Sequence, residues 1–146
     1  ISETAIVGAG VGAAMAGMRP VVDMHFADFI GVCMDEILNQ MAKARYMFGG
    51  QCSMPLVLRA PDGIIRSAAA QHSQSLEAFF LHIPGIKVVI PSNPADAKGL
   101  LKAAIRSEDP VLYFEHKGLF PLKGPVPEGE HIVPIGKAAV SREGSD

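Results

Sequence analysis

Two side chains in this sequence are well suited to catalysis, a carboxylate near the start of the chain and an imidazole far downstream. Glu3 leads into a Gly/Ala-rich apolar stretch, residues 4–18, and His72 stands in the polar island Gln71-His72-Ser73-Gln74. Alternating helix-like and strand-like segments separate them, so the fold could bring both side chains into one cleft. Carboxyl and imidazole groups are common general acids and bases. Taken alone, each residue is more typical of a plainer role, because an acid in a first helical turn stabilises the helix dipole and such a histidine can cap a loop.

The composition predicts a folded domain and argues against several kinds of partner. The 146 residues fit one domain, and 49% of them are apolar against 19% charged, which is typical of a globular chain. The net charge is −2, and no basic run could neutralise the phosphates of a nucleic acid or a membrane. No apolar run is long enough for a membrane-spanning helix. Cys33 and Cys52 are isolated, which predicts reduced thiols in a cytoplasmic protein.

The elements that must position these two side chains alternate between helix and strand. The sequence predicts helices at residues 4–18, 28–48, 73–82 and 95–106, and strands at residues 21–24, 55–60, 87–90 and 111–114. Residues 28–48 give the strongest helix prediction, because apolar side chains recur there at helical spacing. Ser2 is expected to cap the first helix, and Asn93 with Pro94 the last. The strands are apolar on both faces, which predicts an α/β fold, a three-layer, doubly wound and mostly parallel sheet.

The last part of the chain changes in composition. Residues 117–131 turn to Pro, Gly and charge, as in a linker, and residues 132–146 restart an apolar pattern and then stop. We therefore predict a domain over residues 1–116, followed by a linker and the start of a C-terminal domain over residues 117–146. Because the chain begins without Met and within a strand-to-helix turn, we also expect it to be truncated at both ends.

A glycine-rich motif offers an alternative function. Gly8, Gly10 and Ala13 match the G-x-G-x-x-A spacing of dinucleotide-binding turns, and Asp23 could be the acidic ribose ligand. Such a site needs a full strand before the first glycine, and a helix and a strand before the acid, and these segments are too short. The simpler interpretation is a thin helix that packs close against a neighbour. A dinucleotide- or flavin-binding oxidoreductase domain remains the alternative, and no P-loop, HExxH or paired-cysteine motif suggests another.

Several motifs resemble those of one enzyme family. They are Ile1-Ser2-Glu3, Val11-Gly12-Ala13-Ala14-Met15-Ala16-Gly17-Met18-Arg19-Pro20, Ala42-Lys43-Ala44-Arg45-Tyr46-Met47, Ala70-Gln71-His72-Ser73-Gln74, Pro84-Gly85-Ile86-Lys87-Val88-Val89 and Asp96-Ala97-Lys98-Gly99-Leu100-Leu101. In this order and at these intervals, they resemble the β subunit of thiamine-diphosphate-dependent 2-oxo acid dehydrogenases, the first component of those complexes. The resemblance implies the pyrimidine-binding domain of the thiamine-diphosphate-binding fold, without its first strand and helix. The segments 29–35 and 39–43 and Glu115-His116-Lys117-Gly118 look more like the acetoin dehydrogenase branch than the pyruvate branch.

The resemblance implies a role for three side chains. Glu3 would hydrogen-bond the ring nitrogen N1′ of the cofactor's aminopyrimidine and so promote loss of the proton from the thiazolium carbon. A carboxyl in that role needs a raised pKa, which burial against apolar helix residues and a cofactor ring would supply. Phe29 would lie beside the pyrimidine ring, although its position in an amphipathic helix fits a core contact equally well. His72 would lie near the reacting carbon and transfer a proton or stabilise charge there.

The resemblance also implies a site for a structural potassium ion, held largely by backbone carbonyls. The corresponding residues here are Leu56, Ala104, Ile105, Ser107 and Asp109. Backbone ligation tolerates different side chains, because hard cations prefer oxygen ligands. However, Ser107 and Asp109 stand where the pyruvate-branch pattern has Asp and Asn, so potassium could bind but is not required by the pattern.

The chain lacks the family's diphosphate- and magnesium-binding motif, a Gly-Asp-Gly followed by an Asn. In the family that motif lies on the α subunit, which implies an active site between chains and a heterotetramer with a second β subunit. The assembled enzyme would cleave the carbon–carbon bond next to a carbonyl and pass the acyl unit to the lipoyl group of a second component. It is expected to bind neither nucleic acid nor a membrane. A non-catalytic subunit-interaction module is a further alternative, and the chain alone is expected to be inactive.

Overall fold

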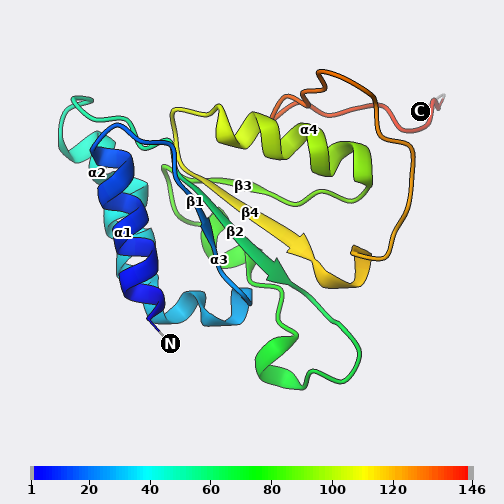
Figure 1. Cartoon of the computed structure of the whole chain (residues 1–146), viewed down its shortest axis with the longest axis horizontal. Helices are drawn as coiled ribbons and strands as arrows, with labels where there is room; N and C mark the ends of the chain where they lie inside the picture. Colours follow the sequence, from blue (N-terminus) through cyan, green and yellow to red (C-terminus); the bar gives the residue numbers. More distant parts are fainter. Residues whose placement is uncertain (1, 145–146) are drawn as a thin grey trace.

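The computed structural model describes residues 2–144 and is built around a four-stranded parallel sheet (Figure 1). The strands are β1 (Val21–Asp23), β2 (Val57–Asp62), β3 (Lys87–Val89) and β4 (Val111–His116), in the order β1-β2-β4-β3. Every strand pair is parallel, and Leu58 of β2 lies between Val22 of β1 and Leu112 of β4. The predicted parallel sheet is therefore confirmed. Ile1, Ser145 and Asp146, which belong to segments discussed above, lie outside the described residues.

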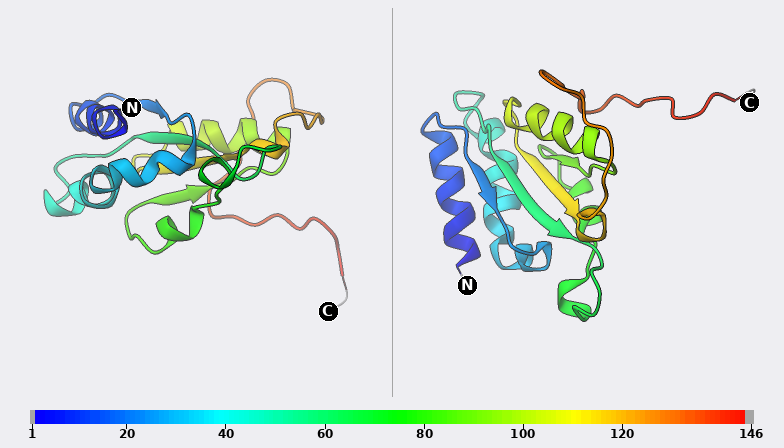
Figure 2. Two further views of the ribbon diagram at one scale, coloured as in Figure 1. Left: turned by 90° about the horizontal axis from the view of Figure 1, so that it is seen from below. Right: turned by 45° about the vertical axis from the view of Figure 1, so that its right-hand side comes forward.

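Helices lie on both faces of the sheet, which gives the predicted three layers (Figure 2). One face is covered by α4 (Pro94–Ile105), and the other by the π-helical segment η2 (Glu36–Met41), α2 (Ala42–Met47) and α3 (Glu77–Leu81). The first helix, α1 (Glu3–Met15), lies beside the edge strand β1. The described residues also form the 3₁₀ segments η1 (Ala27–Cys33), η3 (Ala70–His72) and η4 (Lys117–Leu119).

Two cores, one on each face of the sheet, account for the apolar strands. The larger core joins β2 and β4 to α1, η2, α2 and α3, and its members include Leu58, Leu112, Phe114, Ile37 and Phe80. The smaller core lies under α4, and its members include Val57, Val111, Tyr113 and Ala104. Successive residues of a strand point to opposite faces, so β2 and β4 supply both cores at once. This is why their sequences do not alternate between apolar and polar residues.

The glycine-rich segment is helical, as the simpler interpretation predicted. Gly8, Gly10 and Ala13 all lie within α1, so no strand–turn–helix exists there to hold a dinucleotide. A Cβ atom on Gly10 would come 2.4 Å from Val22 Cγ2 and 3.0 Å from Leu56 Cδ1. The missing side chain therefore lets α1 approach the sheet closely. The dinucleotide- or flavin-binding alternative has no support in this geometry.

The strongest helix prediction, residues 28–48, is wrong in its detail. The segment is helical, but it is divided into the 3₁₀ segment η1, the π-helical segment η2 and the α-helix α2. Ala27, Ile30 and Cys33 are buried at every third position, and a helix with three residues per turn places all three on one face. Contacts with α1 and the sheet thus decide the local winding, and the average helical spacing in the sequence did not reveal it.

The other predicted elements are present with shifted ends. Asn93 caps α4 as predicted, because its side chain accepts a hydrogen bond of 2.9 Å from the backbone N–H of Asp96, and Pro94 is the first helical residue. Ser2 precedes α1 but makes no capping hydrogen bond with its side chain. The helix predicted at residues 73–82 shortens to α3, since η3 and a bend precede it.

Part of the segment after η4 lies along α4. Lys98 Nζ donates a 2.7 Å hydrogen bond to the carbonyl of Pro127, and Lys102 and Arg106 both pair with Glu130. Hydrogen bonds from Lys102 and then Arg106 lower the pKa of Glu130 to about 2. Within the described part of residues 120–144, no regular helix or strand forms.

Gly85 gives a test of how closely the segment before β3 packs against α2. It has a φ of +99°, and a Cβ atom there would lie 2.1 Å from the carbonyl oxygen of Ala42. Gly85→Ala in the complete subunit is therefore expected to lower the free energy of unfolding by about 3 kcal/mol, from backbone strain and the clash. Gly12→Ala is the matched control, because its Cβ meets nothing within 4 Å and alanine favours the helix by about 0.5–1 kcal/mol. Urea unfolding midpoints measure both, and equal midpoints for Gly85→Ala and the wild type would contradict this account.

The described residues contain no helix with the length and apolar character needed to cross a bilayer.

Candidate active site

Phe26, Phe29 and His72 form an aromatic cluster from two distant segments. The His72 ring lies edge-on to both phenylalanines, with ring centroids 4.8 Å from Phe26 and 5.5 Å from Phe29, and the two phenylalanine rings are 6.2 Å apart. Phe26 and Phe29 stand at the start of η1, and His72 ends η3. The structure therefore brings together two of the three side chains that the sequence singled out.

The cluster lies at the carboxyl end of the sheet. The chain leaves β1 toward Phe26 and Phe29, leaves β2 into the loop that carries His72, and leaves β4 into η4. In Figure 1 the arrowheads of β2 and β4 point toward the same end of the molecule as η1 and the start of α1. Ligands of open α/β sheets bind at this end, because the loops that follow the strands meet there.

Glu3 lies at the same end, in the first turn of α1. The next residue fixes the helix to η1, since Thr4 Oγ1 donates a 3.0 Å hydrogen bond to the carbonyl of Val32. The Glu3 residue is half-buried. The raised pKa expected for Glu3 depends on burial by a partner chain and a cofactor ring, so it stays a prediction.

Glu3, Phe29 and His72 lie outside two hollows of the described residues. One hollow of about 220 Å³ lies between the start of α4 and the end of β4, lined in part by Asn93 and His116. Another, of about 450 Å³, lies beside the end of α2, lined in part by Arg45 and Gly85. None of the three predicted side chains lines either hollow. All three lie toward the carboxyl end of the sheet.

Two buried charges beneath the cluster were not found from the sequence. The side chains of Lys117 and Asp28 are only 4% and 2% exposed, with Lys117 Nζ 4.0 Å from Asp28 Oδ2. Lys117 Nζ also donates a 2.8 Å hydrogen bond to the carbonyl of His72 and lies 4.6 Å from the centroid of the Phe26 ring. Charged residues are rarely this buried, and only burial, which a sequence does not display, distinguishes these two from solvated ones.

Asp62, the last residue of β2, is a third buried charged group. It is 0% exposed, and neither carboxylate oxygen has a hydrogen-bond partner among the described residues. Burial, and then the nearby carboxyl of Glu77, raise the pKa of Asp62 to about 7, although Lys117 opposes the shift. A carboxyl that keeps its proton near neutral pH is uncharged, so its burial costs less than that of a carboxylate.

The Asp62 pKa predicts a pH-dependent stability. The folded-state pKa of Asp62 lies above the unfolded-state value. Its contribution to the stability of the folded state is therefore complete below about pH 4 and is lost as the pH rises to about 7. Asp62→Asn, which is neutral at every pH, should therefore gain stability relative to the wild type as the pH rises from 5 to 8, by on the order of a few kcal/mol. Thermal unfolding of both proteins at each pH measures it. Asp35→Asn, at an exposed carboxylate, is the control, and parallel pH profiles for Asp62→Asn and the wild type would refute the prediction.

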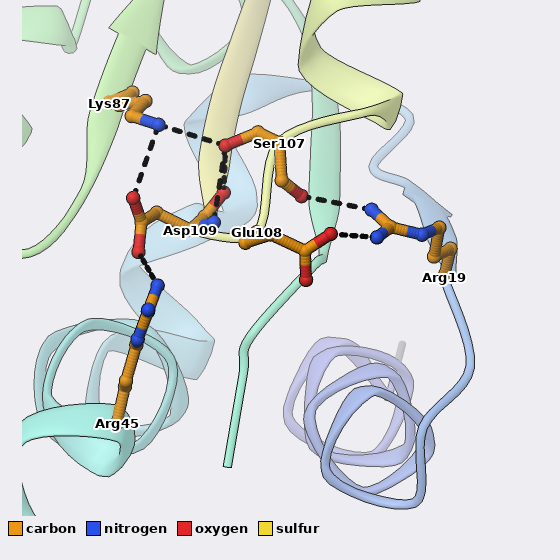
Figure 3. Close-up of polar contacts among 6 residues, drawn as sticks. All are labelled: Arg19, Arg45, Lys87, Ser107, Glu108 and Asp109. Carbon is orange, nitrogen blue, oxygen red and sulfur yellow. Dashed lines mark hydrogen bonds and ion pairs between the residues drawn. The ribbon is translucent and has the colours of Figure 1, made fainter. Parts of the chain in front are cut away.

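The residues predicted for potassium lie in or around the loop that precedes β4, at the opposite end of the sheet. Two of them, Ser107 and Asp109, are labelled in Figure 3. Each of their backbone carbonyls accepts a hydrogen bond from within the chain. The donor–acceptor pairs are Val111 N to Leu56 at 2.9 Å, Ser107 N to Ala104 at 3.1 Å, Arg19 Nη1 to Ile105 at 3.3 Å and to Ser107 at 3.2 Å, and Ser107 Oγ to Asp109 at 2.7 Å. A carbonyl oxygen has two lone pairs, so potassium remains a prediction.

Three side-chain cations already hold this loop. Arg19 pairs with Glu108, while Arg45 and Lys87 approach the Asp109 carboxylate from two other elements (Figure 3). Burial would raise the pKa of Asp109, but Lys87 and then Arg45 outweigh it, so the pKa lies below its usual range. Among the residues that the structure describes, no cluster of His, Cys, Asp and Glu has the arrangement of a metal site.

Comparison with known proteins decides the family. The transketolase pyrimidine-binding domain matches residues 1–123. The chain belongs to the transketolase pyrimidine-binding domain family. The resemblance inferred from the motifs is thus confirmed.

Relatives of this pyrimidine-binding domain are subunits of dehydrogenases. The chain is 56% identical over 146 residues to the acetoin:2,6-dichlorophenolindophenol oxidoreductase subunit beta of Cupriavidus necator, covering 43% of that protein. It is 54% identical over 147 residues to the 2-oxoisovalerate dehydrogenase subunit beta of Bacillus subtilis, covering 45%. Both matches include the whole chain, which spans less than half the length of these relatives.

A solved structure confirms the fold. The chain matches a "split gene transketolase, inactive beta4 tetramer" with a TM-score of 0.64 and 22% identity, over 78% of this chain and 34% of that one. At this identity the likeness concerns the three-layer architecture alone.

Proposed function

We propose that this pyrimidine-binding domain belongs to the β subunit of a thiamine-diphosphate-dependent dehydrogenase that acts on acetoin or on a 2-oxo acid. The observation that carries the proposal is the meeting of Phe29 and His72 at the carboxyl end of the sheet, at the same end as Glu3. The identity to acetoin and 2-oxoisovalerate dehydrogenase β subunits supports the reaction class. In this proposal residues 1–116 are the cofactor-binding domain, and residues 117–146 lead into a C-terminal domain.

The chemistry of these side chains fits thiamine diphosphate. A half-buried carboxyl and a half-buried phenylalanine at one edge suit an aminopyrimidine, which has a basic ring nitrogen and two aromatic faces. When bound, the cofactor supplies an acidic carbon that adds to the substrate carbonyl and allows the neighbouring carbon–carbon bond to break. Glu3 would hold a proton at the ring nitrogen, and Phe29 would orient the ring. His72 would transfer a proton to or from the substrate.

The position of the three side chains supports a site that a second chain completes. They line neither of the two hollows described above, and an α subunit that binds magnesium and the diphosphate would cover them. Covering Glu3 with protein and a cofactor ring would also raise its pKa, because burial disfavours the charged carboxylate. A second β subunit and a lipoyl-bearing component that takes the acyl unit complete the proposed complex, in the cytoplasm of a bacterium.

The substrate is tested with the complete β subunit and its α partner. Reduction of 2,6-dichlorophenolindophenol, with thiamine diphosphate and magnesium present, compares acetoin, pyruvate and 2-oxoisovalerate as substrates. The proposal expects the highest kcat/KM with acetoin. A preference for pyruvate or 2-oxoisovalerate would remove the acetoin assignment and leave the dehydrogenase class in place, whereas no turnover of any substrate would contradict the function.

The division of the site between subunits has a separate test. Isothermal titration of the β subunit alone with thiamine diphosphate and magnesium should show binding weaker than micromolar, because the diphosphate has no ligands on this chain. The reconstituted pair is the control and should bind at least about tenfold more tightly, a difference of only about 1.4 kcal/mol. Micromolar binding by the β subunit alone would refute the shared site.

A further inference from the structure

We infer that Asp28 and Lys117 form a buried clasp that fixes the position of His72, an inference that rests on the role proposed above for His72. The two residues come from η1 and η4, which follow different strands. Neither touches the predicted reacting groups through its charge, so both are positioning residues rather than catalytic ones.

Lys117 holds the His72 residue from two sides. Its Nζ donates a 2.8 Å hydrogen bond to the His72 carbonyl. The same nitrogen lies 4.6 Å from the centroid of the Phe26 ring, and that ring lies 4.8 Å from the imidazole. One cation therefore contacts both the backbone of His72 and the aromatic ring against which its side chain packs. A cation over an aromatic face is attracted to it, more strongly when water is excluded.

Asp28 holds the same turn two residues later. Its Oδ1 accepts hydrogen bonds from the backbone N–H and the side-chain Nε2 of Gln74, at 3.2 and 2.8 Å. The carbonyl of Gln74 in turn accepts a 2.9 Å hydrogen bond from the N–H of Gly63, at the end of β2. Asp28 is also next in sequence to Phe29, so the same element sets the positions of Phe29 and of the turn that carries His72.

The burial of both charges indicates that the clasp is more than incidental packing. Taking a carboxylate and an ammonium out of water is costly unless hydrogen bonds and the opposite charge compensate. Here the two charges are 4.0 Å apart, and each binds the same turn. Lys117 donates to the His72 carbonyl, and Asp28 accepts from Gln74. Removing either charge would leave the other uncompensated, so the pair acts as a unit.

The rest of the loop gives His72 little other support. Residues 64–67 and 69–71 are exposed, and Arg66 and Ala69 have positive φ values of 43° and 62°. Among the described residues, the His72 N–H donates to the carbonyl of Ala69 in the same loop, at 3.3 Å. Loops with exposed backbone and few buried contacts open at low free-energy cost. The clasp is therefore what keeps the imidazole against Phe26 and Phe29.

The test uses the complete β subunit assembled with its α partner. Hydrogen–deuterium exchange of peptides that cover residues 63–76 reports loop opening, and steady-state kinetics report kcat and KM. Lys117→Met keeps much of the volume and removes the charge. It should speed exchange in residues 63–76 about tenfold or more, and it should lower kcat about 10- to 100-fold with a smaller change in KM, because a misplaced catalytic group costs rate.

Three further variants make the result specific to the clasp. Lys117→Arg should restore part of the exchange protection and part of kcat, since a guanidinium can still donate to the His72 carbonyl. Gln74→Ala removes one of the two bonds to Asp28 and should give smaller changes of the same kind; Gln74 is exposed, so this variant keeps the test open if Lys117→Met does not assemble. Lys123→Met, at an exposed lysine outside the site, should match the wild type.

The outcomes separate the clasp from the proposed function. Unchanged exchange in residues 63–76 for both Lys117→Met and Gln74→Ala would overturn the inference, even if kcat fell. Faster exchange together with an unchanged kcat would overturn it as well, since His72 would then not need this position. If the wild-type complex turned over no substrate, the function would fail, while the exchange measurements would still decide whether the clasp holds the loop.

Discussion

Glu3→Gln is expected to slow turnover of the assembled enzyme about 10²- to 10⁴-fold, the range that a general acid–base group contributes. Glutamine has nearly the same shape as glutamate, but its amide cannot pass a proton to and from a ring nitrogen. The fold should survive, because Glu3 lies at the first position of α1 and is half-buried. Losing its charge there costs only about 0.3–1 kcal/mol of helix-dipole stabilisation.

Two rates measure the effect of Glu3→Gln. One is turnover, and the other is the exchange with deuterium of the hydrogen on the cofactor's thiazolium carbon. The exchange rate reports the removal of this proton alone. It therefore separates the role of Glu3 in that step from any effect of the variant on later steps that involve the substrate. Glu128→Gln makes the same chemical change at an exposed residue after η4 and should leave both rates unchanged. An exchange rate in Glu3→Gln equal to that of the wild type would remove Glu3 from the mechanism.

His72→Ala should lower kcat about 10²-fold, since proton transfer by a positioned imidazole contributes at least that much. The variant should fold, because the lost edge-on contacts with Phe26 and Phe29 are worth only about 0.5–1.5 kcal/mol each. The clasp of Asp28 and Lys117 binds the backbone of the turn, and it should therefore remain in place.

His82→Ala is the matched control for His72→Ala, because His82 is exposed at the end of α3. Its kcat should equal that of the wild type. Single-turnover kinetics with saturating cofactor would show whether the loss lies in chemistry rather than in product release. If His72→Ala kept the wild-type single-turnover rate, the imidazole would not take part in the reaction.

The sequence by itself was sufficient for the architecture, and it supplied the prediction of three site residues. Apolar runs such as Val88 and Val89 predicted buried parallel strands, because both faces of such strands are covered. Asn93 and Pro94 predicted the start of α4 from local hydrogen bonding alone. Glu3, Phe29 and His72 came from the order and spacing of motifs, which are properties of the chain.

The tertiary structure decided what depends on contacts between distant residues. The winding of residues 27–47 follows from packing against α1, and local spacing could not reveal a switch from 3₁₀ to π geometry. The same holds for Asp28, Asp62 and Lys117, which look like solvated charges in the sequence and become buried only when three strands end side by side. Burial changes the energy of a charge far more than that of an apolar group, so the residues hardest to assess from sequence are those whose environment the fold creates.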